Sequence, residues 1–362
     1  MRARITLALL TGLSFVEGET SLAQQAPHAA HRIFELGEFR LESGAVLPAA
    51  KLLYVTYGRL NSRKDNAVLV TSYHGGNHHG YDFLIGPGLA LDTTKYFIVV
   101  TEMFASGGSS SPSNTPAPFH GPHFPPVAIR DNVAAAHRLL TEGLALQHIR
   151  AVMGFSMGAQ QALQWAVTHG DYVDKVAAWC GTARTYPHTW VFLETGILTW
   201  KAGEAFANGE YRSRPAKASA AVAAHWASWV FSSEWWLREL YKPTWASPEA
   251  LIQAWATDSM AQDPNNEISQ SQTWQRHNVG DTPGFRGDLK RALGSIRAEV
   301  LFMPCTTDMY FLERDIEAES RLIPRVKVVP IPSVWGHAAG GGPNTEDAGF
   351  LNREIGNFLK SR

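Results

Sequence analysis

The chain has 362 residues, and its 32 basic and 33 acidic side chains leave a formal net charge of −1. This balance lacks the basic surplus of a nucleic-acid binder, so we expect no nucleic-acid partner. A hydrophobic share of 45% excludes a disordered chain, whereas 18% charged residues and 12 tryptophans indicate a large core with further apolar surface.

The first residues have the pattern of an export signal. Arg2 and Arg4 precede a mostly apolar stretch, residues 5–16, and Ala23 ends a small-residue cleavage motif. The stretch is too short to span a bilayer, which takes about 20 residues. We therefore expect residues 1–23 to be a signal peptide and the mature chain to lack a membrane span. The protein would then be exported, either periplasmic or secreted.

Short runs of β-branched and aromatic residues recur along the chain and predict strands. Several are apolar without alternation, which is typical of parallel strands covered on both faces. The predicted strands are residues 51–57, 67–73, 96–101, 150–154, 175–180, 299–304 and 326–331. Helical patterns occupy residues 127–140, 157–167 and 346–359. This alternation predicts an α/β protein with a mostly parallel central sheet.

The strand rhythm breaks between residues 186 and 286. This segment holds nine of the twelve tryptophans, shows several helical spacings and contains no strand-like run. We interpret it as a Trp-rich helical lid inserted into a core formed by residues 31–185 and 287–362. The tryptophans could pack inside the lid or line a pocket, and the sequence leaves both open.

The chain has two cysteines, Cys180 and Cys305, each at the end of a predicted strand. Two cysteines exclude a disulfide-dense scaffold and a four-cysteine zinc site. Neighbouring parallel strands could bring them close enough for a disulfide. We favour two buried free thiols, because cysteine is among the most buried residue types.

The sharpest motif is Gly154-Phe155-Ser156-Met157-Gly158, which joins a predicted strand to a predicted helix. That context is the one a G-x-S-x-G nucleophile elbow requires. The turn strains the serine backbone and lifts the hydroxyl above the sheet, and only glycine fits beside it. A capping serine at a glycine-rich helix start is the simpler alternative, and the partners described next argue against it.

A serine hydroxyl needs a base and an orienting carboxylate, which follow this motif in the order acid, then histidine. Of fourteen histidines, only His337 lies beyond the last predicted strand. Asp308 follows the preceding strand, whereas Glu313 and Asp315 fall in a helical pattern. We therefore predict a catalytic triad of Ser156, Asp308 and His337.

Acyl transfer also needs preorganised donors for the oxyanion. We assign one to the backbone N–H of Met157, directly after the nucleophile. The second should come from the loop after predicted strand 67–73, where Gly75 and Gly76 allow close approach of the backbone. We favour Gly76 over Gly75 for this role.

Three histidines of that loop, His74, His78 and His79, raise the question of a metal. They lack a paired set of ligands at helical spacing, and a polar loop accounts for them equally well. We therefore expect neither a metal nor a cofactor.

Further motifs spread over most of the chain match one enzyme family. They are Leu41-Glu42-Ser43-Gly44, Ile85-Gly86-Pro87-Gly88 with Leu91-Asp92-Thr93, Phe124-Pro125 with Ile129-Arg130-Asp131, and Gln161-Ala162-Leu163-Gln164-Trp165-Ala166. With them the chain resembles the homoserine O-acetyltransferase branch of the α/β-hydrolase superfamily. The resemblance implies an α/β-hydrolase core with a helical lid and carries Ser156, Asp308 and His337 over as the triad. It also makes a homodimer through the lid helices plausible.

Three functions are compatible with these features. The first is a serine-dependent carboxylic ester hydrolase acting through an acyl-serine on a small to medium ester. The second is an O-acyltransferase that moves an acetyl group from acetyl-CoA to a hydroxyl acceptor such as homoserine. The export signal and the lack of a recognisable homoserine-binding motif favour hydrolysis. The third, a silent binding protein, has no need of a complete triad.

Overall fold

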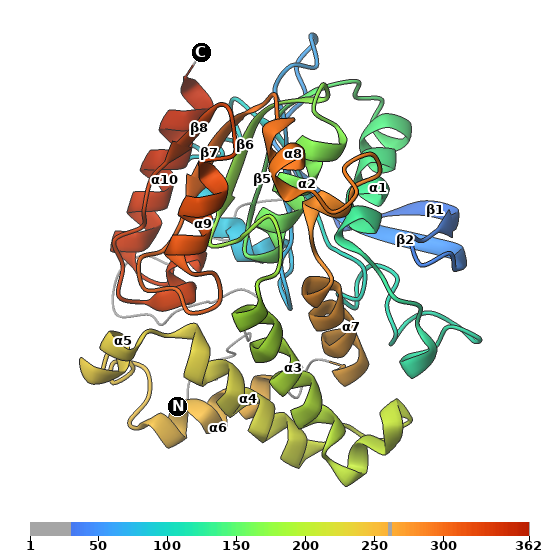
Figure 1. The fold of residues 1–362 in the computed structure, drawn as a ribbon, viewed down its shortest axis with the longest axis vertical. Coiled ribbons are helices and arrows are strands. Elements are labelled where there is room, and N and C mark those ends of the chain that lie inside the picture. The colour runs from blue at the N-terminus through green and yellow to red at the C-terminus, as the bar shows by residue number, and fades with distance from the viewer. Residues whose placement is uncertain (1–29, 260–262, 362) are drawn as a thin grey trace.

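The computed structural model describes residues 30–259 and 263–361, so the predicted signal peptide lies outside the described residues. Its centre is an eight-stranded sheet in the order β1-β2-β4-β3-β5-β6-β7-β8 (Figure 1). The strands are β1 (Arg32–Arg40), β2 (Val46–Tyr57), β3 (Ala67–Thr71), β4 (Phe97–Thr101), β5 (Ile149–Phe155), β6 (Val173–Trp179), β7 (Glu299–Met303) and β8 (Val326–Val328). All pairs from β4 to β8 are parallel, which confirms the mostly parallel sheet.

The middle of the sheet is buried on both faces. All five residues of β3 are buried, and so are the last five of both β5 and β6. Because successive side chains of a strand point to opposite faces, burial without alternation means that both faces are covered. The continuous apolar runs in the sequence indicated this burial on both faces, and the strands that contain them were predicted best.

Helices between the parallel strands, together with α10 after the last strand, cover the sheet. They are α1 (Ile129–Arg138), α2 (Met157–Thr168), α8 (Leu289–Gly294), α9 (Glu313–Ser320), α10 (Thr345–Lys360) and the 3₁₀ helix η1 (His78–Leu84). At the start of α10, the Asn344 side chain accepts a hydrogen bond from the Asp347 backbone N–H at 2.9 Å. Lys360 lies in the last turn, where a cation stabilises the negative end of the helix dipole.

The first strand, β1, was not predicted from the sequence. Among the described strands it pairs with β2 alone, at the edge of the sheet, and its burial pattern does not alternate regularly. Gly37, with a φ of +64°, lies where the register shifts, so the strand changes its inward face midway. Such an irregular, charge-rich edge strand leaves no clear period in the sequence.

The described part of the inserted segment consists of helices joined by turns and loops. It contains α3 (Pro187–Lys201), α4 (Ala216–Val230), α5 (Ser233–Leu237), α6 (Pro248–Ser259) and α7 (Pro264–Gln275), with the 3₁₀ turn η4 (Glu204–Gly209) after α3. Figure 1 shows these helices gathered at one end of the sheet. Six of its nine tryptophans are buried, so most of them pack within the lid or against the core. Trp190, in contrast, is 44% exposed.

The two cysteines are buried free thiols, which confirms the interpretation we favoured. Burial raises the pKa of Cys305 to about 12 and that of Cys180 well above its usual range. Both thiols therefore stay protonated and act as small apolar side chains.

A buried carboxyl on α9 makes the stability of the fold depend on pH. Oε2 of Glu319 accepts a hydrogen bond from the Ala183 backbone N–H at 2.7 Å, and burial raises the pKa of Glu319 to about 8. Above its ordinary pKa of 4.5, the unfolded chain loses this proton while the folded protein keeps it. Stability contributed by this group therefore falls as pH rises from 4.5 to about 8 and is constant above that.

We expect Glu319→Gln to remove this dependence, because glutamine keeps the acceptor and has no charge to desolvate. In thermal melts, Tm of the variant relative to that of the unmodified protein should rise steadily between pH 5 and pH 8.5. The control is Glu317→Gln, an exposed position on the same helix. Parallel Tm curves for Glu319→Gln and the unmodified protein would contradict the prediction.

Candidate active site

The nucleophile lies at a strained turn between β5 and α2. Ser156 has φ of +58° and ψ of −123°, a conformation that residues with a side chain rarely adopt. A Cβ at Gly154 would collide with the backbone of Gly158, and one at Gly158 with the carbonyl oxygen of Thr71. The two glycines of the motif are therefore required by packing, as the sequence predicted.

The three residues of the predicted triad lie together in the structure. Nε2 of His337 is 2.9 Å from Oγ of Ser156, and Nδ1 of His337 is 2.7 Å from Oδ2 of Asp308. They come from the segments that follow β5, β7 and β8, whose carboxyl ends share one edge of the parallel sheet. All three are at least 96% buried.

The carboxylate of Asp308 is held in one orientation. Its Oδ1 accepts hydrogen bonds from the backbone N–H groups of Tyr310 at 2.7 Å and Phe311 at 3.1 Å. Oδ2 is thereby directed at His337, and a carboxylate can only accept, so Nδ1 carries the proton. Nε2 is then free of a proton and can accept one from the Ser156 hydroxyl, as a general base must.

Aromatic rings enclose the imidazole of His337. The ring of Phe155 stacks on it with centroids 4.6 Å apart, and the rings of Tyr310 and Phe311 lie at 4.5 and 5.6 Å. Tyr310 in turn stacks on Phe192 of α3, at 4.5 Å. Such packing fixes the plane of the imidazole and keeps bulk water from it.

The lid is joined to the loops that carry the acid and the base. Thr189 of α3 donates a hydrogen bond to the Tyr310 carbonyl at 2.6 Å, and the Ser232 hydroxyl donates to that of Val334. Gly336, with φ of +63°, lies so close to the end of α4 that a Cβ would collide with the carbonyl oxygen of Val230. These contacts were not foreseen from the sequence, because they join segments about 100 residues apart.

The two predicted oxyanion donors, the backbone N–H groups of Met157 and Gly76, differ in whether they already donate a hydrogen bond. No acceptor is assigned to the N–H of Met157 among residues 30–259 and 263–361, so it is available at the start of α2. The N–H of Gly76, in contrast, donates to the Tyr73 carbonyl at 2.8 Å within a turn. That of Gly75 donates to Oε1 of Gln270 at 2.7 Å. The structure therefore argues against Gly76 as the second donor, because a turn bond already uses its N–H.

The same loop lies against the lid helix α7. Nε2 of His74 is 3.0 Å from the Ser271 hydroxyl, and its ring lies 4.7 Å from that of Trp226 and 6.0 Å from that of Trp274. Burial lowers the pKa of His74 to about 4, so the ring is neutral at pH 7. In the described part of the chain, no acceptor is assigned to the backbone N–H of His74.

A hollow at the opposite edge of the sheet has a different character. It is lined by residues such as Arg150, Lys175 and Glu299, at the beginnings of β5, β6 and β7. Nζ of Lys175 lies 2.6 Å from Oε2 of Glu299, and Arg150 donates to the Leu359 carbonyl. These charges hold the fold together, and the triad is at the other edge.

Comparison with known proteins agrees with this geometry. A family model described as the alpha/beta hydrolase fold matches residues 70–339. The chain belongs to the α/β-hydrolase fold family. This α/β-hydrolase is 35% identical to an ethyl acetate hydrolase of Pseudomonas veronii over 342 residues, which are 92% of this chain and 97% of the relative.

Two further proteins similar to this α/β-hydrolase are named for two different reactions, ester hydrolysis and acyl transfer. The solved structure of an acetylester hydrolase from Corynebacterium glutamicum matches with a TM-score of 0.89 and 33% identity, covering 92% of this chain and 96% of that one. A homoserine O-acetyltransferase of Nautilia profundicola is 36% identical over 188 residues, 47% of this chain and 51% of the relative. The resemblance stated from the sequence motifs is thus confirmed.

The family and the geometry together make this α/β-hydrolase an enzyme, with the chemistry of a hydrolase or an acyltransferase. Among the described residues, no helix combines the length and apolar character needed to cross a bilayer. Sequence reasoning missed Gln270 on the lid and the backbone N–H groups that orient Asp308. Gln270 leaves no motif, whereas the N–H groups could have been placed, since they lie two and three residues after the acid.

Proposed function

We propose that this protein is a serine carboxylesterase that cleaves esters of short acyl groups through an acyl-serine intermediate. The observation that carries the proposal is the continuous hydrogen-bonded series from Ser156 through His337 to Asp308. Nε2 of His337 takes the hydroxyl proton as Oγ of Ser156 attacks the ester carbonyl, and then gives that proton to the departing alcohol. Water, activated by the same nitrogen, releases the acid.

Charge that develops in each step meets a preorganised group. The side chain of Asp308 orients His337 and stabilises the imidazolium that forms there. The oxyanion would bind the N–H of Met157, and we propose the backbone N–H of His74 in place of that of Gly76 as the second donor. The N–H of Gly75 is an alternative, provided that the substrate oxygen displaces Gln270.

The acyl group is proposed to be small, with acetyl as the preferred case. Ser156 is 3% exposed, and aromatic rings crowd the triad from the core and from the lid. Relatives that span nearly the whole chain are named for ethyl acetate and acetyl ester hydrolysis. A long acyl chain would have to displace buried rings such as those of Tyr310 and Phe192, at a cost of about 1–3 kcal/mol.

Acyl transfer to a hydroxyl acceptor is the second candidate. It needs the same acyl-serine and differs only in the nucleophile that resolves it. The identity with a homoserine O-acetyltransferase supports it, although over about half of the chain. Export of the protein, which remains a prediction, would separate it from cytosolic acetyl-CoA and favour water.

A single set of assays distinguishes these functions. We expect kcat/KM for p-nitrophenyl acetate to exceed that for p-nitrophenyl octanoate by at least ~10-fold, because each added methylene must find room. Acetyl-CoA with homoserine should release no thiol. Thiol release that requires homoserine would replace hydrolysis by acyl transfer, and equal rates for the two esters would contradict a small acyl site.

A further inference from the structure

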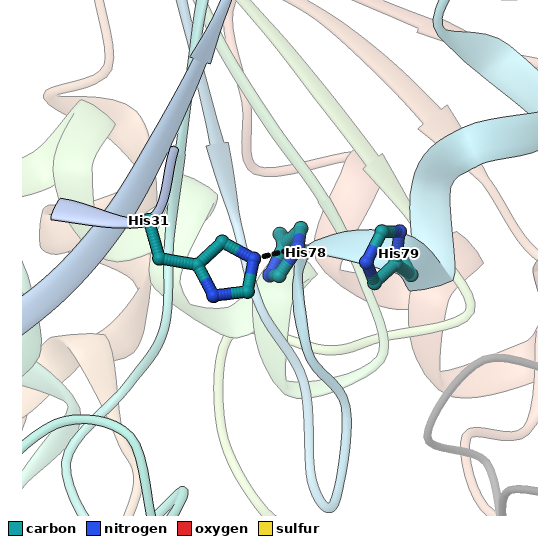
Figure 2. A group of neighbouring side chains, drawn as sticks. All are labelled: His31, His78 and His79. Atoms are coloured by element: carbon teal, nitrogen blue, oxygen red, sulfur yellow. Dashed lines mark hydrogen bonds between the residues drawn. The ribbon is translucent and has the colours of Figure 1, made fainter. Parts of the chain in front are cut away.

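Three histidines lie together outside the triad. His31 directly precedes β1, whereas His78 and His79 begin η1, just after the loop that faces the lid. Figure 2 shows the rings of His31 and His78 meeting at their nitrogen atoms, with His79 beyond. Nε2 of His31 lies 3.0 Å from Nε2 of His78. One ligand nitrogen from each of the three histidines lies within 4.8 Å of the others.

Carboxylates hold two of these rings from behind. Nδ1 of His78 lies 2.9 Å from Oε1 of Glu102, and Nδ1 of His79 lies 2.8 Å from Oδ2 of Asp82. A carboxylate partner places the proton on Nδ1 and leaves the lone pair on Nε2, the atom that binds a metal. Histidines that ligate a metal in proteins commonly have such a partner on the other nitrogen.

We propose that His31, His78 and His79 form a binding site for a divalent transition metal of the zinc class. Imidazole suits Zn²⁺, Cu²⁺ and Ni²⁺, and three neutral histidines plus a water complete a four-coordinate zinc site. Zn–N bonds of about 2.0–2.1 Å separate ligand nitrogens by roughly 3.4 Å, whereas the three nitrogens here lie within 4.8 Å of one another. The metal would replace the Nε2–Nε2 hydrogen bond of His31 and His78, and the proton of that bond would move to Nδ1 of His31. Glu102 and Asp82 supply negative charge to offset that of the ion.

The ion would tie the edge strand to the catalytic end of the sheet. His31 stands at the start of β1, and His78 is anchored through Glu102 to the chain directly after β4. His31 and His78 are 47 positions apart in the sequence, which explains why loop spacing alone indicated no metal. His74, which the sequence grouped with His78 and His79, instead faces the lid.

The test is metal binding by the full chain, stripped of metal and carrying no histidine tag. We expect one equivalent of Zn²⁺ to bind in calorimetry and to raise Tm by a few degrees at saturation. Co²⁺ should give the visible absorption bands of a low-coordinate site. Ester hydrolysis is not a readout, so failure here leaves the proposed function untouched.

Two variants and a matched control assign the site. His31→Gln and His79→Gln should each weaken Zn²⁺ binding by at least ~10-fold while leaving the metal-free Tm within about a degree. His148→Gln replaces a histidine that pairs with Asp174 at 2.9 Å elsewhere on the surface, and it should bind as the unmodified protein does. Absence of stoichiometric binding, or equal affinity in all three variants, would overturn the proposal.

Discussion

Replacing Ser156 with alanine should lower kcat for p-nitrophenyl acetate by at least ~10³-fold, because no other group takes over nucleophilic attack. Alanine keeps the Cβ at the same positive φ, so the elbow gains no new strain. The melting temperature should therefore stay near that of the unmodified protein. Initial rates at saturating ester, together with a thermal melt, measure both.

Ser228→Ala is the matched control for this experiment. Ser228 is an exposed serine on α4 whose hydroxyl donates a hydrogen bond to the His225 carbonyl at 2.8 Å, within the same helix. Its replacement should leave kcat unchanged. If Ser156→Ala kept more than a tenth of the activity with an intact fold, the acyl-serine mechanism would be wrong.

Asp308→Asn should lower kcat by about 10²–10⁴-fold, although the shape of the side chain hardly changes. The backbone N–H groups of Tyr310 and Phe311 need an acceptor, so the amide oxygen will take the place of Oδ1. The amide NH₂ then faces Nδ1 of His337 and forces that nitrogen to accept. The proton moves to Nε2, which can no longer take one from Ser156.

The sequence offers a control for this variant as well. Asp315 is the acid that the helical pattern excluded, and the structure places it in the first turn of α9. Asp315→Asn should retain full activity. If kcat fell strongly in Asp315→Asn and stayed near normal in Asp308→Asn, the assignment of Asp308 as the orienting carboxylate would be wrong.

The parts of the fold that could be predicted are those whose signal is local. Each of the strands β3 to β7 contains a continuous apolar run because both of its faces are covered there, and α1 and α10 keep a helical period. The edge strand β1 bears polar residues and a change of register at Gly37, so its period is lost. The element that was not predicted is thus the edge strand, which within the described residues has a neighbouring strand on one side only.

In the candidate site, too, the residues with a local sequence signal were predicted and the contacts between distant segments were not. Ser156, Asp308 and His337 could be placed because parallel strands bring their carboxyl ends to one edge in a known order. The turn bond of the Gly76 N–H, which argues against Gly76 as a donor, could not be predicted, because a glycine pair does not indicate which N–H a turn will use. Contacts between distant segments, such as Gly75 with Gln270 or His31 with His78, leave no trace in local spacing.

The hydrogen bonds from Thr189 and Ser232 to the loops of the acid and the base limit how this enzyme can be re-engineered or can diverge. A lid that covered the entrance and made no contact with the triad loops could be exchanged between relatives as an independent segment. Here the insertion forms part of the frame that aligns the triad, so excising or swapping it would disrupt the catalytic machinery along with specificity. New substrates are more accessible through inward-facing lid side chains that leave these two anchors in place.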